Sequence, residues 1–186
     1  MFPLTLLPLP GELVPLHIFE PRYRELLTDC ETTDMSFGIY CNHELNTLKI
    51  GSLMKLESVI KRYPSGESDI IVRCTDTFFL DKLYRTFPPK KYPGGDVRLN
   101  NVNLSQIPSI ELYELFLIYQ SRRNLKNYAS VSTYQIAQDL SLDLLERYKF
   151  LTSSAGKQQA FLINQLKFQM HILLQEEKSR DVFHLN

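Results

Sequence analysis

Residues 153–158, which read Ser-Ser-Ala-Gly-Lys-Gln, are the chain's nearest approach to a phosphate-binding loop. A P-loop needs the pattern GxxxxGK[ST], because its first glycine lets backbone N–H groups surround the phosphates and its last hydroxyl binds magnesium. Here those two positions hold Leu151 and Gln158. The seven glycines also provide no GxGxxG fingerprint for a dinucleotide. We therefore expect no nucleotide chemistry and interpret the segment as a turn that enters a helix.

Metal binding and thiol catalysis are the next candidates. Cys30, Cys41 and His43 could together donate three metal ligands. Zinc sites, however, usually show paired spacings such as CxxC or HxxxH, because adjacent turns must direct two ligands at one ion. No local signature marks these cysteines, or Cys74, as a nucleophile. We expect no metal, no cofactor and no catalytic residue, and three widely spaced cysteines indicate buried thiols in the cytoplasm.

Lone histidines and glutamates are interpreted structurally. His17 and His171 lie beside apolar neighbours, which favours a packed imidazole with one hydrogen-bond partner. Proline is tolerated in the first turn of a helix, where an N–H has no partner. We therefore expect a helix to begin at Pro21, with Glu20 favouring its positive end. The sequence gives no support for acid–base catalysis by Glu12 and Glu20.

The charge balance favours no polyanionic partner. Lysine plus arginine and aspartate plus glutamate both number 21 in 186 residues, and 44% of the residues are hydrophobic, as in ordinary soluble domains. Nucleic-acid binding would depend on a local patch, such as Lys90-Lys91 or Arg122-Arg123 with Lys126. Solvated faces or cations at a helix C-terminus explain these clusters more simply. No uncharged stretch approaches the roughly 20 residues that span a bilayer, so we expect no membrane partner.

The first half of the chain has the pattern of a β-rich domain. Within 53–62, Met54, Leu56 and Ile60 alternate with charged residues, as in a half-buried strand. The turn Tyr63-Pro64-Ser65-Gly66 predicts a hairpin with the next strand. Several short strands with one early helix predict a small, partly open barrel. Strands are predicted over 37–41, 53–62, 69–80 and 97–104.

The second half changes to a helical period. Helices are predicted to start at Ser109, at Thr133, at Ser141, and at Ser153 or Ser154, where a hydroxyl can cap the first turn. The last helix is the longest. Its buried stripe is predicted to contain Ile163, Leu166, Met170, Leu173 and Leu174.

The opening of the chain carries the most specific pattern. Residues 2–4 (Phe-Pro-Leu), 9–12 (Leu-Pro-Gly-Glu), 15–23 (Pro-Leu-His-Ile-Phe-Glu-Pro-Arg-Tyr) and 37–39 (Phe-Gly-Ile) together resemble the N-terminal substrate-binding domain of ATP-dependent Lon proteases. Residues 136–142 (Ile-Ala-Gln-Asp-Leu-Ser-Leu) resemble the stretch in which one short helix of that domain yields to the next. The resemblance covers nearly the whole chain.

This resemblance implies an α+β fold, with a β-rich, PUA-like pseudo-barrel that holds one inserted helix and an α-helical lobe that follows. Residues 1–107 would form the β-rich subdomain and residues 108–186 the helical one, together a single Lon-type domain. It also implies a free-standing form, because an ATPase and a Ser–Lys protease domain do not fit in this chain. We therefore expect a non-catalytic module that recognises unfolded polypeptide or a partner protein.

Two other functions stay open. The chain could be an accessory component of an ATP-dependent peptidase system, or a PUA-like RNA-binding protein. Peptidase assays with and without ATP would test the first, and a salt-dependent gel shift would test the second. A weak homo-oligomer is also left open, and the sequence does not identify the bound polypeptide.

The connection from Tyr84 to Gly95 is the predicted binding surface. Its length is unusual between two strands of a compact domain, and long loops often carry function. Tyr84, Phe87 and Tyr92 offer large amphipathic contacts of the kind that anchor partners. Alternatively, these rings close the end of the barrel, and the resemblance places a structural tyrosine at Tyr92. We also expect the ring of Phe19 in the barrel core.

Overall fold

The computed structural model describes residues 1–123 and 131–183. This part of the chain has an α+β fold, as predicted, with a six-stranded mixed sheet and five helices. The chain divides into two compact units, Met1–Leu104 with Asp143–Thr152, and Ser105–Leu142 with Ser153–Asn186. Asp143–Thr152, which the sequence groups with the helical half, thus belongs to the unit that contains the strands.

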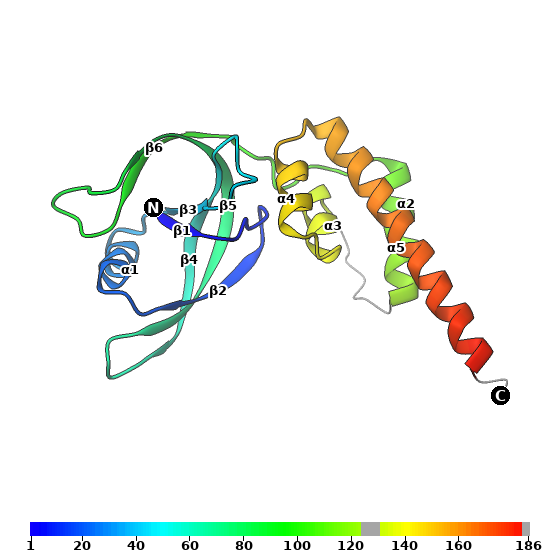
Figure 1. Ribbon diagram of the computed structural model, residues 1–186, viewed down its shortest axis with the longest axis horizontal. Helices are drawn as coiled ribbons and strands as arrows, with labels where there is room; N and C mark the ends of the chain where they lie inside the picture. Colours follow the sequence, from blue (N-terminus) through cyan, green and yellow to red (C-terminus); the bar gives the residue numbers. More distant parts are fainter. Residues whose placement is uncertain (124–130, 184–186) are drawn as a thin grey trace. The chain divides into compact units, whose positions relative to one another are not determined.

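The sheet of the first unit is open between β1 and β2. Its order is β1-β3-β4-β5-β2, and β6 pairs with the part of β5 that β2 leaves uncovered. The β1–β3 pair is parallel and the other pairs are antiparallel. Figure 1 shows these strands curling into the partly open barrel. They are β1 (Phe2–Leu4), β2 (Leu13–Ile18), β3 (Phe37–Cys41), β4 (Ile50–Arg62), β5 (Ser68–Tyr84) and β6 (Gly94–Leu99).

Helix α1 (Pro21–Thr33) begins where the sequence predicts. Glu20 has extended backbone at the N-cap, and Pro21 occupies the first turn. The ring of Phe2 stacks on that of Tyr23, with 4.0 Å between centroids. The helix buries Tyr23, Leu26, Leu27 and Cys30 in one core with side chains of β2 to β5.

The predicted hairpin joins β4 and β5, which pair along almost their full lengths. The Gly66 N–H donates to the Tyr63 carbonyl oxygen at 2.9 Å, and Gly66 has a φ of +88°, which glycine adopts without steric cost. Ile70, Val72 and Cys74 all point into the core, as predicted.

The predicted alternation along β4 fails at Ile60. Met54 is fully buried, whereas Ile60 is 64% exposed. The register with β5 shifts between Leu56 and Ser58 and again around Val59, so Val59 packs against the core in place of Ile60. A bulge of this kind depends on the partner strand, and the sequence of β4 alone does not reveal it.

The prediction for Phe19 is wrong, because its side chain is 55% exposed. Along β2 the inward positions are Val14, Leu16 and Ile18, and Ile18 fills the core. Phe19 follows Ile18 and therefore lies on the outer side, where the chain turns into α1.

Strand β6 also differs from its prediction, since it ends at Leu99 and not at residue 104. The carboxylate of Asp76 accepts the N–H groups of Asn101 at 3.0 Å and Val102 at 3.1 Å. Asn101 has a φ of +52°, which ends the extended conformation.

Four helices follow β6, and two of their caps match the predicted residues. Ser109 Oγ accepts the Leu112 N–H at 3.3 Å, and the last helix begins directly after Ser154. Asp143, and not Ser141, caps the third of them, in a capping box with Glu146. Ser132, and not Thr133, caps the second of them, because its side chain accepts the Gln135 N–H. The helices are α2 (Ile110–Arg123), α3 (Thr133–Asp139), α4 (Leu144–Leu151) and α5 (Ala155–Phe183).

The buried stripe of α5 is offset from the predicted one. The predicted Leu166 is fully buried, and so is Leu162 one helical turn before it, which was not predicted. Leu174 is 39% exposed, and the other predicted members, Ile163, Met170 and Leu173, are half-buried. Helix α2 packs against α5 and determines which face of α5 is buried. The position of α2 cannot be inferred from the sequence of α5.

Candidate functional site

The three predicted binding residues have different environments in the structure. Tyr92 is buried, with 7% of its surface exposed, whereas Phe87 is 47% exposed. Tyr84 is half-buried at the end of β5, and its hydroxyl donates to Asp96 Oδ2 at 2.6 Å. Phe87 and Tyr92 line the same pocket, and Tyr84 lies beside Phe87 with 6.3 Å between ring centroids.

Asp29 of α1 fixes the connection between β5 and β6. The Tyr92 hydroxyl donates to Asp29 Oδ2 at 2.5 Å, and Lys90 Nζ donates to Asp29 Oδ1 at 2.8 Å. These hydrogen bonds, from Lys90 first and then Tyr92, hold the pKa of the Asp29 carboxyl below its usual value. Burial and the neighbouring Asp29 raise the pKa of Tyr92. Tyr92 therefore anchors the connection to α1.

The ring of Phe87 lies on the backbone of Gly94. A Cβ atom at Gly94 would lie 2.8 Å from the ring carbons Cγ and Cδ2 of Phe87, so only glycine admits the ring at this separation. The backbone of the connection pairs Phe87 with Lys90 across its tip. Phe87 is therefore a wall of the pocket that presents about half of its surface to solvent.

The pocket next to Phe87, which we call the Phe87 pocket, has a volume of about 380 Å³. A volume of this size lies within the range of small-ligand pockets and accommodates a large apolar side chain. Met1 and Met35 both line this pocket, and methionine adapts to ligands of different shape because its side chain has three rotatable bonds. Its apolar side chains are Met1, Leu26, Met35, Phe37, Leu53, Phe78, Phe87, Tyr92, Pro93 and Val97.

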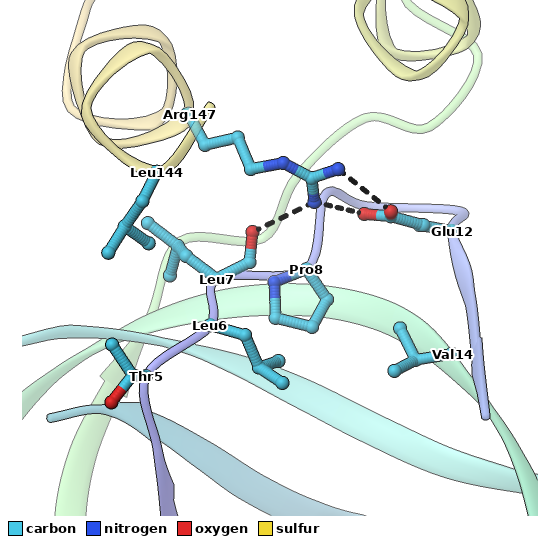
Figure 2. Close-up of a pocket in the computed structure, with 8 residues that line it drawn as sticks. All are labelled: Thr5, Leu6, Leu7, Pro8, Glu12, Val14, Leu144 and Arg147. Carbon is cyan, nitrogen blue, oxygen red and sulfur yellow. Dashed lines mark hydrogen bonds and ion pairs between the residues drawn. The ribbon is translucent and has the colours of Figure 1, made fainter. Parts of the chain in front are cut away.

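A second pocket, of about 310 Å³, lies between the start of the chain and α4 (Figure 2). Arg147 of α4 binds the Glu12 carboxylate through both of its terminal nitrogens, at 2.6 and 3.0 Å, and reaches the Leu7 carbonyl oxygen at 3.3 Å. Glu12 also accepts the Leu9 N–H at 2.7 Å. The guanidinium and the carboxylate thus hold the segment between β1 and β2, and the arginine is committed to that ion pair.

A third pocket, of about 340 Å³, lies at the opening of the barrel, between β1 and β2. We call it the β1–β2 pocket. Its wall on one side comes from Phe2, Pro3, Leu4 and Leu6, and on the other from residues of β2. Phe19 and Tyr23 close it toward α1.

The residues considered above for catalysis and metal binding do not assemble. Cys30, Cys41 and Cys74 are buried, and burial raises the pKa of Cys30 to about 11 and that of Cys74 to about 12. These thiols stay protonated at neutral pH, whereas thiol nucleophiles act as thiolates. In the described part of the chain, no three histidine, cysteine or acidic side chains cluster with the geometry of a metal site.

Neither histidine is packed as predicted. The side chain of His17 is 48% exposed, and its Nδ1 lies 2.6 Å from Asp69 Oδ1. His171 is exposed and bonds to Gln175 at 3.3 Å. The two-residue period of a β-strand explains why His17 is exposed, because the odd-numbered residues of β2 face outward.

The basic clusters each have a local explanation within their own unit. Lys90 is bound to Asp29, and Arg122 and Arg123 occupy the last turn of α2, the position that helix dipoles favour for cations. Lys126 lies outside the described residues. Among the described helices, none combines the length and hydrophobicity needed to cross a bilayer.

Of the comparisons with known proteins, the search of solved structures found proteins that are similar to this chain. No family model and no curated protein sequence matches the chain significantly. A solved structure of a Lon N-terminal domain protein from Xanthomonas campestris matches 91% of this chain and 95% of its own, with a TM-score of 0.66 and 22% identity. The N-terminal domain of a Mycobacterium avium complex Lon protease matches 93% of this chain and 92% of its own, at a TM-score of 0.47 and 15% identity.

The open barrel with its inserted helix and the helices after it thus define an α+β protein of a known type. The likeness to the Xanthomonas campestris protein shows that this chain has the fold of a Lon N-terminal domain. The fold implied by the sequence resemblance is confirmed.

Residues that the sequence did not single out also contribute to the Phe87 pocket. Met35 follows α1, Gly94 begins β6, and Asp29 holds the loop from α1. None of them lies within a recognisable motif. Asp29 and Tyr92 are far apart in the sequence, so their hydrogen bond could not be predicted from a local pattern. The only signal is general: a partly buried tyrosine hydroxyl usually finds an acceptor, and a carboxylate is a strong one.

Proposed function

We propose that this chain is a polypeptide-recognition module of the Lon N-terminal type that does not catalyse a reaction itself. Its clients would be unfolded or partly folded polypeptides, and the Phe87 pocket would receive one of their apolar side chains. The observation that carries this proposal is the Phe87 pocket itself, a largely apolar pocket of about 380 Å³ with the half-exposed Phe87 ring in its wall. The shared fold adds support by analogy, because fold alone does not determine function.

The chemistry of the pocket suits such clients. Burying one leucine or phenylalanine side chain contributes about 1.5 to 3 kcal/mol, so a single pocket holds a chain weakly. Weak and adaptable contacts allow many sequences to bind, and several contacts along one chain raise the total affinity. The protonated thiols and the absence of a phosphate loop support a binding role in preference to catalysis. The three free thiols support the cytoplasm as its compartment.

The test is binding of fluorescein-labelled β-casein, a chain that lacks a stable fold, measured by fluorescence anisotropy. Phe87→Ser should weaken binding about tenfold, because the lost ring is worth at least about 1.4 kcal/mol of contact. Tyr84→Ser should weaken it less, because Tyr84 contacts Phe87 but does not line the pocket. Phe168→Ser is the matched control, since Phe168 is also about half-exposed, at 58%, but belongs to α5.

Thermal melting of each variant separates folding from binding. Equal binding by the wild type and Phe87→Ser, with both folded, would remove the Phe87 pocket from the proposal. Absence of casein binding by the wild type would reject the proposed function. A salt-dependent shift of RNA in a gel, with no casein binding, would replace it with the RNA-binding alternative.

A further inference from the structure

Strand β2 is an edge strand whose outer backbone groups face the opening of the barrel. The Cys74 N–H donates to the Glu12 carbonyl oxygen at 2.9 Å, which sets the alternation of the ladder between β2 and β5. Val14, Leu16 and Ile18 then direct their N–H and C=O groups toward β5, and Leu13, Pro15 and His17 direct theirs to the free edge. Pro15 fits this register, because a proline in a sheet occupies positions where no N–H is needed.

No described residue bonds to the backbone groups of Leu13, Pro15 or His17 on that edge. Leu13 and His17 each keep an N–H there, and all three residues keep a carbonyl oxygen. Proteins commonly protect an edge with charges, proline or a covering element, because such an edge pairs with other chains. Here Pro15 protects only the middle of the edge.

Apolar side chains lie on both faces of this edge. On the outer face, Leu13 is 49% exposed. The β1–β2 pocket borders the edge with walls that include Leu4, Leu6 and Leu16, and the half-exposed Phe19 closes it beside the charged Glu20 and Arg22. A strand added to β2 would therefore direct alternate side chains toward the pocket and toward Leu13.

The Phe19 end of the edge carries charges of both signs. Arg24 Nε donates to the Phe19 carbonyl oxygen at 2.8 Å and Arg22 pairs with Glu20, while two carboxylates flank His17. His17 Nδ1 lies 2.6 Å from Asp69, and His17 Nε2 lies 3.7 Å from Glu67, so one imidazole lies between two carboxylates. Tyr63 donates to Asp69 Oδ2 at 2.7 Å, while Lys61 lies over the Tyr63 ring. The Glu67 carboxylate accepts no hydrogen bond from the described residues, and 35% of its side chain is exposed. The partly exposed Glu67 carboxylate is therefore available to pair with a basic side chain.

We propose that the free edge of β2 binds an extended polypeptide segment as an added strand. An apolar side chain of the segment enters the β1–β2 pocket, and a basic side chain at one end pairs with Glu67. This inference rests on the proposed function and names the class of segment that it selects, an extended stretch with alternating apolar residues and a flanking lysine or arginine. The main-chain bonds supply affinity, and the pocket and Glu67 supply selectivity.

The probe is a fluorescein-labelled octapeptide of alternating leucine and threonine that ends in lysine, measured by anisotropy. Two copies carry N-methyl groups, one on the leucines and one on the threonines. A strand pairs through one edge only, so one copy should lose at least about tenfold in affinity and the other should bind within about threefold of the parent. Equal affinity of both copies would overturn strand addition. Because β-casein binding is measured beside it, failure of the peptide alone would leave the proposed function intact.

Two protein variants place the strand on β2. Leu13→Pro removes an N–H from the free edge and Leu13→Ala keeps it, so the proline variant should bind the peptide at least about fivefold more weakly than the alanine variant. Glu67→Lys should weaken the peptide that ends in lysine and strengthen a copy that ends in glutamate. Glu44→Lys, the same charge change in the exposed loop before β4, should affect neither. Identical peptide affinities in the wild type, Leu13→Pro and Glu67→Lys, with all three folded by circular dichroism, would refute the placement.

Discussion

Removing one hydroxyl group, in Tyr92→Phe, tests whether Tyr92 fixes the connection between β5 and β6. The ring stays in place, and only the hydrogen bond of 2.5 Å to the Asp29 carboxylate is lost. Hydrogen bonds to charged groups contribute about 1.5 to 3 kcal/mol, so the variant should lose about that much stability at pH 7. Lys90 remains beside Asp29, so the carboxylate keeps one partner and the loss should stay near the lower end of this range.

The effect should depend on pH with a defined sign. The folded-state pKa of Asp29 is lowered, so the stability that its carboxylate contributes is complete above the ordinary pKa and is lost as the pH falls through the folded-state value. The difference between Tyr92→Phe and the wild type should therefore shrink at pH 3 relative to pH 7. Urea titrations at both pH values measure it. Equal stability of the two proteins at pH 7, or a difference that grows in acid, would refute the anchoring role of Tyr92.

Four shorter predictions follow from the same structure. Leu166→Ala should lower stability by about 2 to 5 kcal/mol in urea titrations and Lys167→Ala by much less, because Leu166 is fully buried; equal losses would show that the buried face of α5 is misassigned. Phe19→Ser should change the melting temperature little, since the ring is about half-exposed, and a large drop would show that the ring packs in the core. Arg147→Leu should cost about 1 to 3 kcal/mol, because the partly buried carboxylate of Glu12 loses its ion pair, and an unchanged urea midpoint would contradict this. The purified protein should hydrolyse neither ATP nor casein, and turnover that survives a second purification would contradict the non-catalytic assignment.

Local signals in the sequence predicted much of the fold. Pro21 after Glu20 marks the start of α1, because both the missing N–H and the fixed φ of proline fit a first turn. The turn at Gly66 marks the β4–β5 hairpin, and alternating apolar residues place Ile70 and Val72 in the core. In these places the local pattern and the tertiary structure require the same conformation.

The structure differs from the sequence prediction where a residue or element far away in the sequence determines the local conformation. The register shifts between β4 and β5 expose Ile60, and the packing of α2 buries Leu162, which the predicted stripe of α5 did not contain. The Asp76 carboxylate ends β6 early by accepting backbone N–H groups of Asn101 and Val102. No residue within the affected element carries these signals.

The candidate site was predictable only in part. Loop length and aromatic content led to Phe87 and Tyr92, which line one pocket. The resemblance offered a structural role for Tyr92 as an alternative, but the residues of the loop could not decide it, because the decision depends on Asp29 of α1, which binds Tyr92 and leaves Phe87 half-exposed. The role of both residues in binding stays a prediction.

The most direct test of the proposed function uses the four methionines as reporters. Met1 and Met35 line the Phe87 pocket, Met54 is fully buried in the barrel core, and Met170 belongs to α5. The measurement is a methyl carbon–proton NMR titration of methionine-labelled protein with unlabelled β-casein. The proposal predicts that the signals of Met35 and Met1 shift or broaden, while those of Met54 and Met170 stay in place. Shifts confined to Met170, or no shift at saturating casein, would contradict recognition of polypeptide by the Phe87 pocket.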